Sequence, residues 1–192
     1  PHPGETILCE GYIVVPGSKG ANQAVAAARA GSATLHVASC GDDGFAPLAL
    51  STMKEAGVDL THVATVSRPT AVALITVDAK AENAIVVASG ANRATNIAQL
   101  EASTFGAGDT LVLQREIPDE ATFAAVALAK QRGARVILNV APAGPVPAET
   151  LAALDVLIVN EHEALVVAKA VGLGAAEPEE AARQSTQRCG CG

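Results

Sequence analysis

Three groups of residues in this chain have types and spacings that could do chemistry, and the first surrounds a glycine turn. Pro16, Gly17 and Gly20 form this turn ahead of an alanine-rich stretch, with Lys19 and Asn22 beside them. Free backbone N–H groups at the start of a helix favour an anion or a polar oxygen. A lysine cation, together with an amide that both donates and accepts hydrogen bonds, suits a polyhydroxylated ligand. Taken alone, the same residues fit equally well a turn that caps a helix beside a solvated lysine.

The second group consists of two carboxylates, Glu116 and Glu163, which each follow a short apolar run. Glu163 closes the sequence Asn160-Glu161-His162-Glu163, and a carboxylate near a phosphate must act through a cation. The structural alternatives are an ordinary loop carboxylate at Glu116 and an acidic first helical turn at 161–163. A zinc site of the H-E-x-x-H type is excluded, because position 166 is valine.

The third group is Gly106-Ala107-Gly108-Asp109, where a glycine turn could offer backbone N–H groups to a phosphate and Asp109 could act as a base. Two nucleotide-binding motifs do not fit the chain. A G-x-x-x-x-G-K-[ST] loop occurs nowhere, and a G-x-G-x-x-G run from Gly106 would end in Leu111. The other interpretation is that Asp109 is only the polar residue in front of a buried strand.

The composition favours a soluble α/β protein, since 49% of the 192 residues are hydrophobic and 2% are aromatic. A net charge of −7 and so few aromatic rings argue against a nucleic-acid partner. No apolar run reaches the roughly 18 residues of a membrane span and no basic leader is seen, so we expect no membrane partner and a cytoplasmic location. The terminal Cys189-x-Cys191 could be a metal or redox pair, but free thiols there and at Cys9 and Cys40 are favoured.

The elements that must position these groups can be predicted from turns and apolar patterns. In the first half of the chain, extended segments are predicted at 5–16, at 35–39 and in a hairpin over 69–87 with its turn at 78–83, and helices at 20–30 and 48–55. Gly31 and Gly57 stand where those helices need a left-handed residue to end.

From residue 110 onwards, strands and helices alternate. Strands are predicted at 110–114, 135–140 and 155–159, and helices at 119–132 and 161–171. Such alternation indicates βαβ crossovers and a parallel sheet covered by helices on both faces. Ligands of these sheets bind beyond the carboxyl ends of the strands. The residues to examine are therefore Glu116, Asn139 to Ala141, and Asn160 to Glu163.

The chain resembles the ribokinase-like (PfkB) carbohydrate kinases, and within them the ribokinases. The resemblance runs in order through residues 3 to 182 and is carried by PGET, GSKGANQAVAAARAG, CGDDGF, AGVDLTHV, TAVALITVD, ASGAN, LVLQREIP, LNVAPA and VNEHEA. It implies a parallel α/β sheet flanked by helices, with a small β lid that closes over the sugar. The lid would comprise segments 5–16 and 69–88, and the sheet segments 17–68 and 89–192.

The resemblance also implies a function, which is transfer of the γ-phosphoryl group of ATP to a sugar hydroxyl. The expected reaction is ribose to ribose 5-phosphate, with Mg²⁺ as cofactor and a monovalent cation such as K⁺ in the complete enzyme. Asn160 looks like a nucleotide-phosphate contact, and Glu163 like the acid that organises Mg²⁺ and phosphate through water. The implied sugar contacts are Gly17, Lys19, Asn22 and Glu116.

Members of this family hold their catalytic aspartate in a D-T-x-G-A-G-D run that leads into a helix, whose N-terminus binds the transferring phosphoryl group. Here Ser103 replaces the first aspartate of the run, and Asp109 leads into a predicted strand. We therefore predict that Asp109 is structural and that this chain holds no catalytic base. Because the family also has a strand before the matched stretch and a catalytic part beyond it, we expect an incomplete, inactive fragment. Ser18 and Ala81 also depart from the family, which usually has glycines there.

Three functional hypotheses follow from these residues. The first is an ATP-dependent ribose kinase seen in part, and the second is a non-catalytic remnant that binds sugar or pairs through its lid. The third keeps the fold but takes another sugar or a nucleoside as substrate. The expected partners are a small sugar, ATP and a second copy, either through the lid strands or by self-association through exposed sheet edges.

Overall fold

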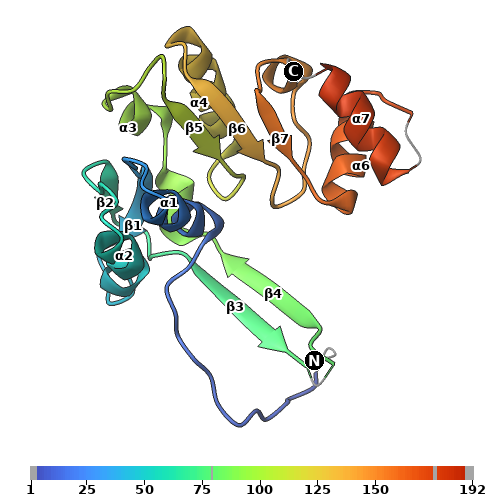
Figure 1. Ribbon diagram of the computed structural model, residues 1–192. Helices are drawn as coiled ribbons and strands as arrows, with labels where there is room; N and C mark the ends of the chain where they lie inside the picture. The colour runs from blue at the N-terminus through green and yellow to red at the C-terminus, as the bar shows by residue number, and fades with distance from the viewer. Residues whose placement is uncertain (1–3, 79, 175–176, 189–192) are drawn as a thin grey trace.

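A computed structural model describes residues 4–78, 80–174 and 177–188, and it shows an α/β body from which a long β-hairpin projects (Figure 1). The elements are α1 (Lys19–Arg29), β1 (Ala38–Gly41), α2 (Ala46–Glu55), β2 (Val63–Val66), β3 (Val72–Val77), β4 (Asn83–Ala88), the 3-10 helix η1 (Gly90–Ala94), α3 (Ile97–Glu101), β5 (Thr110–Leu113), α4 (Asp119–Gln131), β6 (Arg135–Asn139), α5 (Ala148–Ala152), β7 (Val156–Ile158), α6 (Glu161–Ala170) and α7 (Pro178–Arg188). None of the helices within the described residues is long and apolar enough to span a membrane. Cys189 and Cys191 lie outside the described residues.

The parallel strands predicted from the alternating pattern are confirmed, each within two residues of its expected end. β5, β6 and β7 form one parallel sheet in that order, with Leu113 opposite Leu138 and Asn139 opposite Ile158. Every second residue of β6 is buried, and Ala125, Ala129 and their neighbours on α4 pack against that face. Small alanines allow the helix to approach the strands closely, so the core of the molecule lies between α4 and this sheet.

The strand expected at 35–39 forms only from Ala38, and it belongs to a second parallel sheet. β1 pairs with β2 from Ala38 opposite Val63 to Gly41 opposite Val66, whereas Leu35 makes a single bridge to Asp59. No backbone ladder joins β1 to β5 among the described residues. The prediction of a parallel sheet flanked by helices is confirmed, but its strands are divided between two sheets.

The hairpin predicted at 69–87 is confirmed as the antiparallel pair β3–β4, with Val72 opposite Ala88 and Val77 opposite Asn83. Ala81, where the family usually has glycine, takes a φ of +62° in its turn. The strand expected over 5–16 is wrong. That segment forms no strand and is exposed over most of its length, because it lies on no sheet edge that offers it a backbone ladder. We refer to residues 72–88 as the hairpin and to the described residues of 17–68 and 89–188 as the body.

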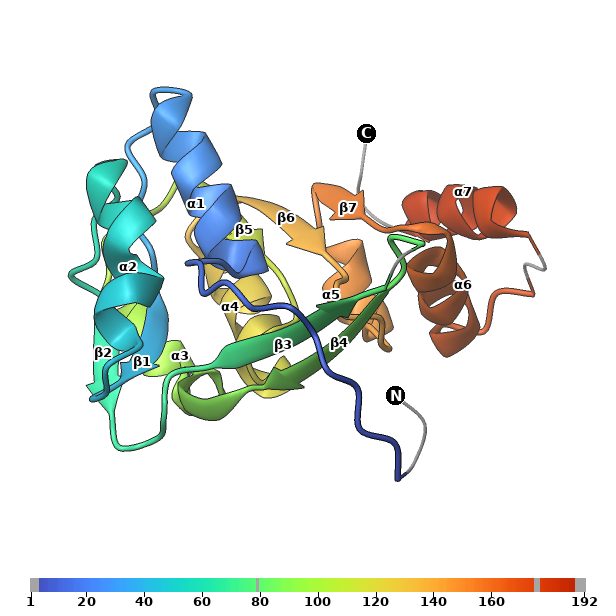
Figure 2. The same ribbon diagram turned by 90° about the horizontal axis from the view of Figure 1, so that it is seen from below.

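Several elements of the body were not predicted from the sequence. They are β2, η1, α3, α5 and α7. Apart from α7 they are four or five residues long, too short to show a hydrophobic period. The helix α7 packs against α6 through buried Ala181 and Ala168, at the far end of the body from α2 (Figure 2).

Candidate active site

The start of α1 and Glu116 lie in direct contact, although 97 positions separate Lys19 and Glu116 in the chain. The backbone N–H of Lys19 donates to Oε2 of Glu116 at 3.0 Å. Ser18 caps the helix, since its hydroxyl oxygen accepts the N–H of Ala21 at 3.0 Å. The structure therefore brings the glycine turn and the carboxylate together, and serine replaces the expected glycine as a helix cap.

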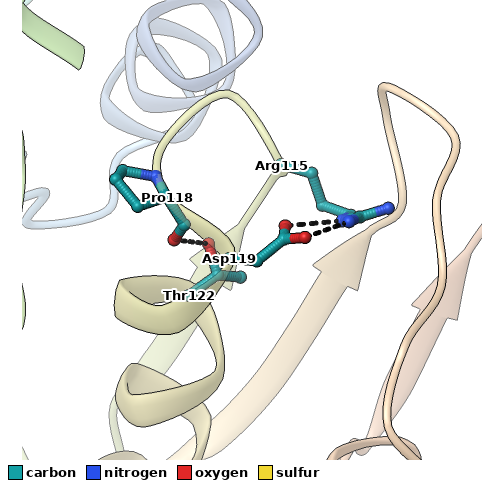
Figure 3. Close-up of polar contacts among 4 residues, drawn as sticks. All are labelled: Arg115, Pro118, Asp119 and Thr122. Atoms are coloured by element: carbon teal, nitrogen blue, oxygen red, sulfur yellow. Dashed lines mark hydrogen bonds and ion pairs between the residues drawn. The ribbon is translucent and has the colours of Figure 1, made fainter. Parts of the chain in front are cut away.

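Glu116 is held by the turn between β5 and α4, which an ion pair closes (Figure 3). Arg115 binds both carboxylate oxygens of Asp119, with Nε–Oδ1 at 3.1 Å and Nη2–Oδ2 at 2.5 Å. The carbonyl of Pro118 accepts the N–H of Thr122 at 3.0 Å as α4 begins. Arg115 and Asp119 were not among the residues predicted from the sequence. Their opposite charges and spacing of four positions at the start of a predicted helix could have indicated an ion pair.

The loop after β6 packs on the same arginine. Arg115 donates its backbone N–H to the carbonyl of Ala141 at 3.1 Å. Its side chain is 7% exposed, and Nη1 has no hydrogen-bond partner within the described part of the chain. A Cβ atom added at Gly144 would lie 1.7 Å from that nitrogen, so a larger residue there would require the guanidinium to move. The backbone of Arg115 thus bonds the loop after β6 to the turn that carries Glu116, and its guanidinium lies close to Gly144.

The first turn of α1 packs directly against the end of β5. A Cβ atom at Gly20 would lie 2.9 Å from Oε1 of Gln114, and Gln114 in turn donates to Gln23. The ring of His36 lies beside the same glycine, and burial lowers the pKa of its imidazole, which favours the neutral ring. Gly20 therefore serves close helix–strand packing, which fixes the distance between the helix start and Glu116.

The remaining predicted sugar contacts, Gly17, Asn22 and the side chain of Lys19, are exposed, and the structure forms no contact between them and Glu116 through side chains. Asn22 instead lines an open groove of about 290 Å³ between α1 and α2, with Pro16, Val25, Ala26, Arg29 and Thr52. These three residues are thus accessible to a ligand, and no hydrogen bond from their own side chains within the described residues fixes their positions.

Asn160 and Glu163 bind each other at the start of α6. Oδ1 of Asn160 accepts the N–H of Glu163 at 2.8 Å, and Oε2 of Glu163 accepts the N–H of Asn160 at 2.8 Å. This reciprocal pair is a capping box, so the structural alternative for these residues is realised. Oε1 of Glu163 forms no hydrogen bond within the described residues, and a carboxylate oxygen is a donor that Mg²⁺ accepts directly or through water.

Glu116 and the Asn160–Glu163 pair lie at the same edge of one sheet. Glu116 follows the carboxyl end of β5 and Asn160 that of β7, with β6 between them. Neighbouring strands lie about 4.8 Å apart, so the two strand ends are about 10 Å from each other. No group of three or more His, Cys, Asp or Glu side chains that could hold a metal forms within the described residues. The geometry suits one ligand lying across the edge rather than a closed metal cage.

Asp109 lies at the opposite edge of the sheet, in the turn that enters β5. Its Oδ2 accepts the N–H of Gly106 at 2.8 Å, and its carbonyl accepts the N–H of Arg135 at 2.9 Å. The carboxylate that resembled a catalytic base thus closes its own turn, and the length of β5 separates it from Glu116.

A parallel sheet with polar groups gathered at its carboxyl edge is the arrangement in which α/β proteins bind their ligands. The sequence pattern described as pfkB family carbohydrate kinase matches residues 2–188, and the chain belongs to this family. The ribokinase of Haemophilus influenzae is 36% identical over 188 residues, which make up 96% of this chain and 60% of that relative.

Solved ribokinases have the same fold. The ribokinase of Thermotoga maritima superposes with a TM-score of 0.79 at 33% identity, over 97% of this chain and 61% of that one. The Arabidopsis thaliana ribokinase complexed with ribose and ATP gives a TM-score of 0.75 at 28% identity, over 97% of this chain and 62% of that one. This chain therefore spans about 60% of the length of these three relatives.

Proposed function

We propose that the chain binds ribose between the start of α1 and Glu116, and ATP near Asn160, in a reaction that phosphorylates a sugar hydroxyl to give ribose 5-phosphate. The observation that carries the proposal is the hydrogen bond between Lys19 N–H and Glu116 Oε2. It joins the glycine turn to the carboxylate at the sheet edge where ligands of such folds bind. The relative complexed with ribose and ATP supports the choice of ligands.

The residues suit this chemistry. A carboxylate only accepts hydrogen bonds, so Glu116 selects ligands rich in hydroxyl donors. The lysine ammonium and the N–H groups at the start of α1 supply the opposite polarity for sugar oxygens. At the other end of the edge, Glu163 would hold Mg²⁺ through water and Asn160 would contact a phosphate oxygen. Bound Mg²⁺ would neutralise the charge that develops on the transferring phosphoryl group.

Asp109, the carboxylate that resembled a catalytic base, lies at the opposite edge of the sheet and is not placed to take the proton of the sugar hydroxyl. We therefore expect the purified 192-residue chain to bind ribose without releasing ADP. Loss of the base and of the groups that stabilise the transition state costs orders of magnitude in rate. Ribose-dependent ADP release by the chain, lost on Asp109→Ala, would reverse this expectation.

Isothermal titration calorimetry with ribose tests the proposed sugar site. Glu116→Ala should weaken binding about 5- to 150-fold, which corresponds to about 1–3 kcal/mol for a lost charged acceptor. Glu120→Ala is the matched control, because Glu120 is an exposed carboxylate four positions further along. Equal affinities for the two variants would show that the sugar does not bind at Glu116. Titration with fructose and adenosine separates ribose from the alternative substrates.

The second hypothesis, pairing between copies through the hairpin, has its own observation. Six large apolar side chains of β3 and β4 are 54–66% exposed: Leu74, Ile75, Val77, Ile85, Val86 and Val87. Side chains alternate along a strand, so Ile75, Val77, Ile85 and Val87 lie on one face of the hairpin, and Leu74 and Val86 on the other. Exposed apolar surface of this kind marks an interaction site. We propose a homodimer that covers this surface with the hairpin of a second copy, in addition to sugar binding. Light scattering coupled to size-exclusion chromatography distinguishes a dimer from a monomer.

A further inference from the structure

The two segments that join the hairpin to the body are bonded to each other. Pro69-Thr70 leads into the hairpin, and Gly90-Ala91 follows it. The N–H of Ala91 donates to the carbonyl of Pro69 at 2.7 Å, and Ala91 is completely buried. None of these residues belongs to the proposed sugar or nucleotide site.

Asp43 ties this junction to the body. Its Oδ2 accepts the N–H of Thr70 at 2.7 Å, and its Oδ1 accepts the Thr70 hydroxyl at 2.8 Å. Oδ1 also accepts the N–H groups of Phe45 and Ala46, at 3.0 and 3.2 Å, where α2 begins. The Thr70 N–H first, and then the other donors, stabilise the charged carboxylate and lower the pKa of Asp43. The Asp43 side chain thus bonds both to the start of α2 and to the segment that leads into the hairpin.

Two glycines show how closely the chain segments approach each other at this point. Gly41, the last residue of β1, donates its N–H to the hydroxyl oxygen of Thr70 at 3.0 Å. A Cβ atom on Gly41 would lie 2.6 Å from the nitrogen of Thr70 and 2.7 Å from Oδ2 of Asp43. A Cβ atom on Gly90 would lie 2.2 Å from the carbonyl oxygen of Pro69. A side chain on Gly41 would therefore push β1 away from Thr70, and one on Gly90 would separate the two segments of the junction.

We propose that Asp43 and Thr70 are positioning residues of the hairpin, which set the angle at which it leaves the body. The hairpin projects on the side toward which the arrows of β5 and β6 point (Figure 1). Glu116 follows the end of β5. Seen from below, it crosses the body with its tip toward β7 and α6 (Figure 2). A fixed angle would hold the hairpin over the carboxyl edge of the sheet. Only this consequence for sugar binding rests on the proposed function.

The angle can be measured without any ligand. Spin labels on cysteines placed at Ala84 in β4 and Glu149 in α5, with the four native cysteines replaced by alanine or serine, report the distance between hairpin and body. Thr70→Val keeps the shape of threonine and removes the hydroxyl, so it should broaden or shift the distance distribution. Thr70→Ser keeps the hydroxyl and should restore the parent distribution. Asp43→Asn should behave like Thr70→Val, and Asp42→Asn, at an exposed neighbouring carboxylate, like the parent.

Ribose titration of the same variants then tests the consequence. Thr70→Val should bind ribose about 2- to 10-fold more weakly, the range for one lost hydrogen bond, and Thr70→Ser should bind it as the parent does. Distance distributions that Thr70→Val and Asp43→Asn leave unchanged would overturn the proposal, as would a shift in Thr70→Ser as large as that in Thr70→Val. If the parent fails to bind ribose, the proposed function is wrong, and the distances still decide the role of Asp43 and Thr70.

Discussion

The body and the hairpin use the same kinds of residue in their strands but bury them very differently. Leu138 in β6 is completely buried, whereas Leu74 in β3 is 63% exposed. β6 lies between two parallel strands and packs against α4, whereas β3 pairs only with β4. An apolar strand pattern therefore predicts a strand but not what covers it. In the body a helix of the same chain covers the strand, and in the hairpin no other element of the described chain does.

The largest expected effect tests burial in the body. Leu138→Ala should lower the free energy of unfolding by about 2–5 kcal/mol, because it leaves a cavity in the core. Leu74→Ala is the matched control and should change it by less than about 0.5 kcal/mol. Urea denaturation measures both values. Comparable losses in the two variants would mean that the hairpin is as well covered as the core, and the comparison would fail.

A smaller effect tests the junction between the two regions. Gly90 has a φ of +41° and no space for a side chain beside the carbonyl of Pro69. Gly90→Ala should therefore destabilise the protein by about 1–3 kcal/mol. Gly44→Ala, at a position where a Cβ atom meets nothing within 4 Å, serves as the control in the same thermal melts. Equal melting temperatures for both variants would show that the junction adapts freely.

What the sequence could predict depends on the range of the interaction. Strands 110–114 and 135–140 and the hairpin were predictable because apolar periodicity and turn residues are local signals. Segment 5–16 has the same local signal and forms no strand, because a strand requires a neighbouring edge that the pattern alone does not reveal. The division of the parallel strands between two sheets is a property of pairing, and it was equally hidden.

The candidate site shows the same contrast between local signals, which the sequence reveals, and long-range contacts, which it does not. The sheet rule placed Glu116 and Asn160 at one edge, since strand direction follows from the alternation of strands and helices. The contact of Lys19 with Glu116 joins positions 97 residues apart, and its partners could be named only from the family resemblance. Asp43 was quoted within a motif but given no role, because its hydrogen bonds to Thr70 span 27 positions and no local pattern indicates them.

An acid titration tests the contacts of Asp155, which lies at the amino edge of the β5–β6–β7 sheet. Oδ2 of Asp155 accepts the N–H of Val136 at 2.7 Å and an ammonium hydrogen of Lys130 at 3.0 Å. The Val136 bond first, and then Lys130, lower the pKa of Asp155 below its ordinary value of 3.8. A lowered pKa in the folded state stabilises the protein above that value, and this contribution is lost as the pH falls through the lowered pKa.

The free energy of unfolding measured between pH 5 and pH 2 should therefore decline less steeply in Asp155→Asn than in the parent. Asp43 and Asp59, whose pKa values are also lowered by hydrogen bonds, should retain part of the decline in the variant. Identical slopes for Asp155→Asn and the parent would show that the Asp155 contacts do not persist in solution. Asp42→Asn, at an exposed carboxylate, is the control.

The smallest expected effect on stability is that of a substitution in the hairpin. Such a substitution should change the association of two copies rather than the free energy of unfolding. Val86 in β4 is 66% exposed, so Val86→Lys should alter the free energy of unfolding of the monomer by less than about 0.5 kcal/mol. If a second copy covers this surface, two lysines at the interface would face apolar side chains without partners, and burying an unpaired charge is costly. Light scattering should then show a dimer for the parent and a monomer for Val86→Lys. Lys80→Ala, in the exposed turn, tests whether charge at the hairpin alone changes association. A dimer that survives Val86→Lys would move the contact to another surface, such as the opposite face of the hairpin with Ile75 and Ile85, or the outer edge of β5.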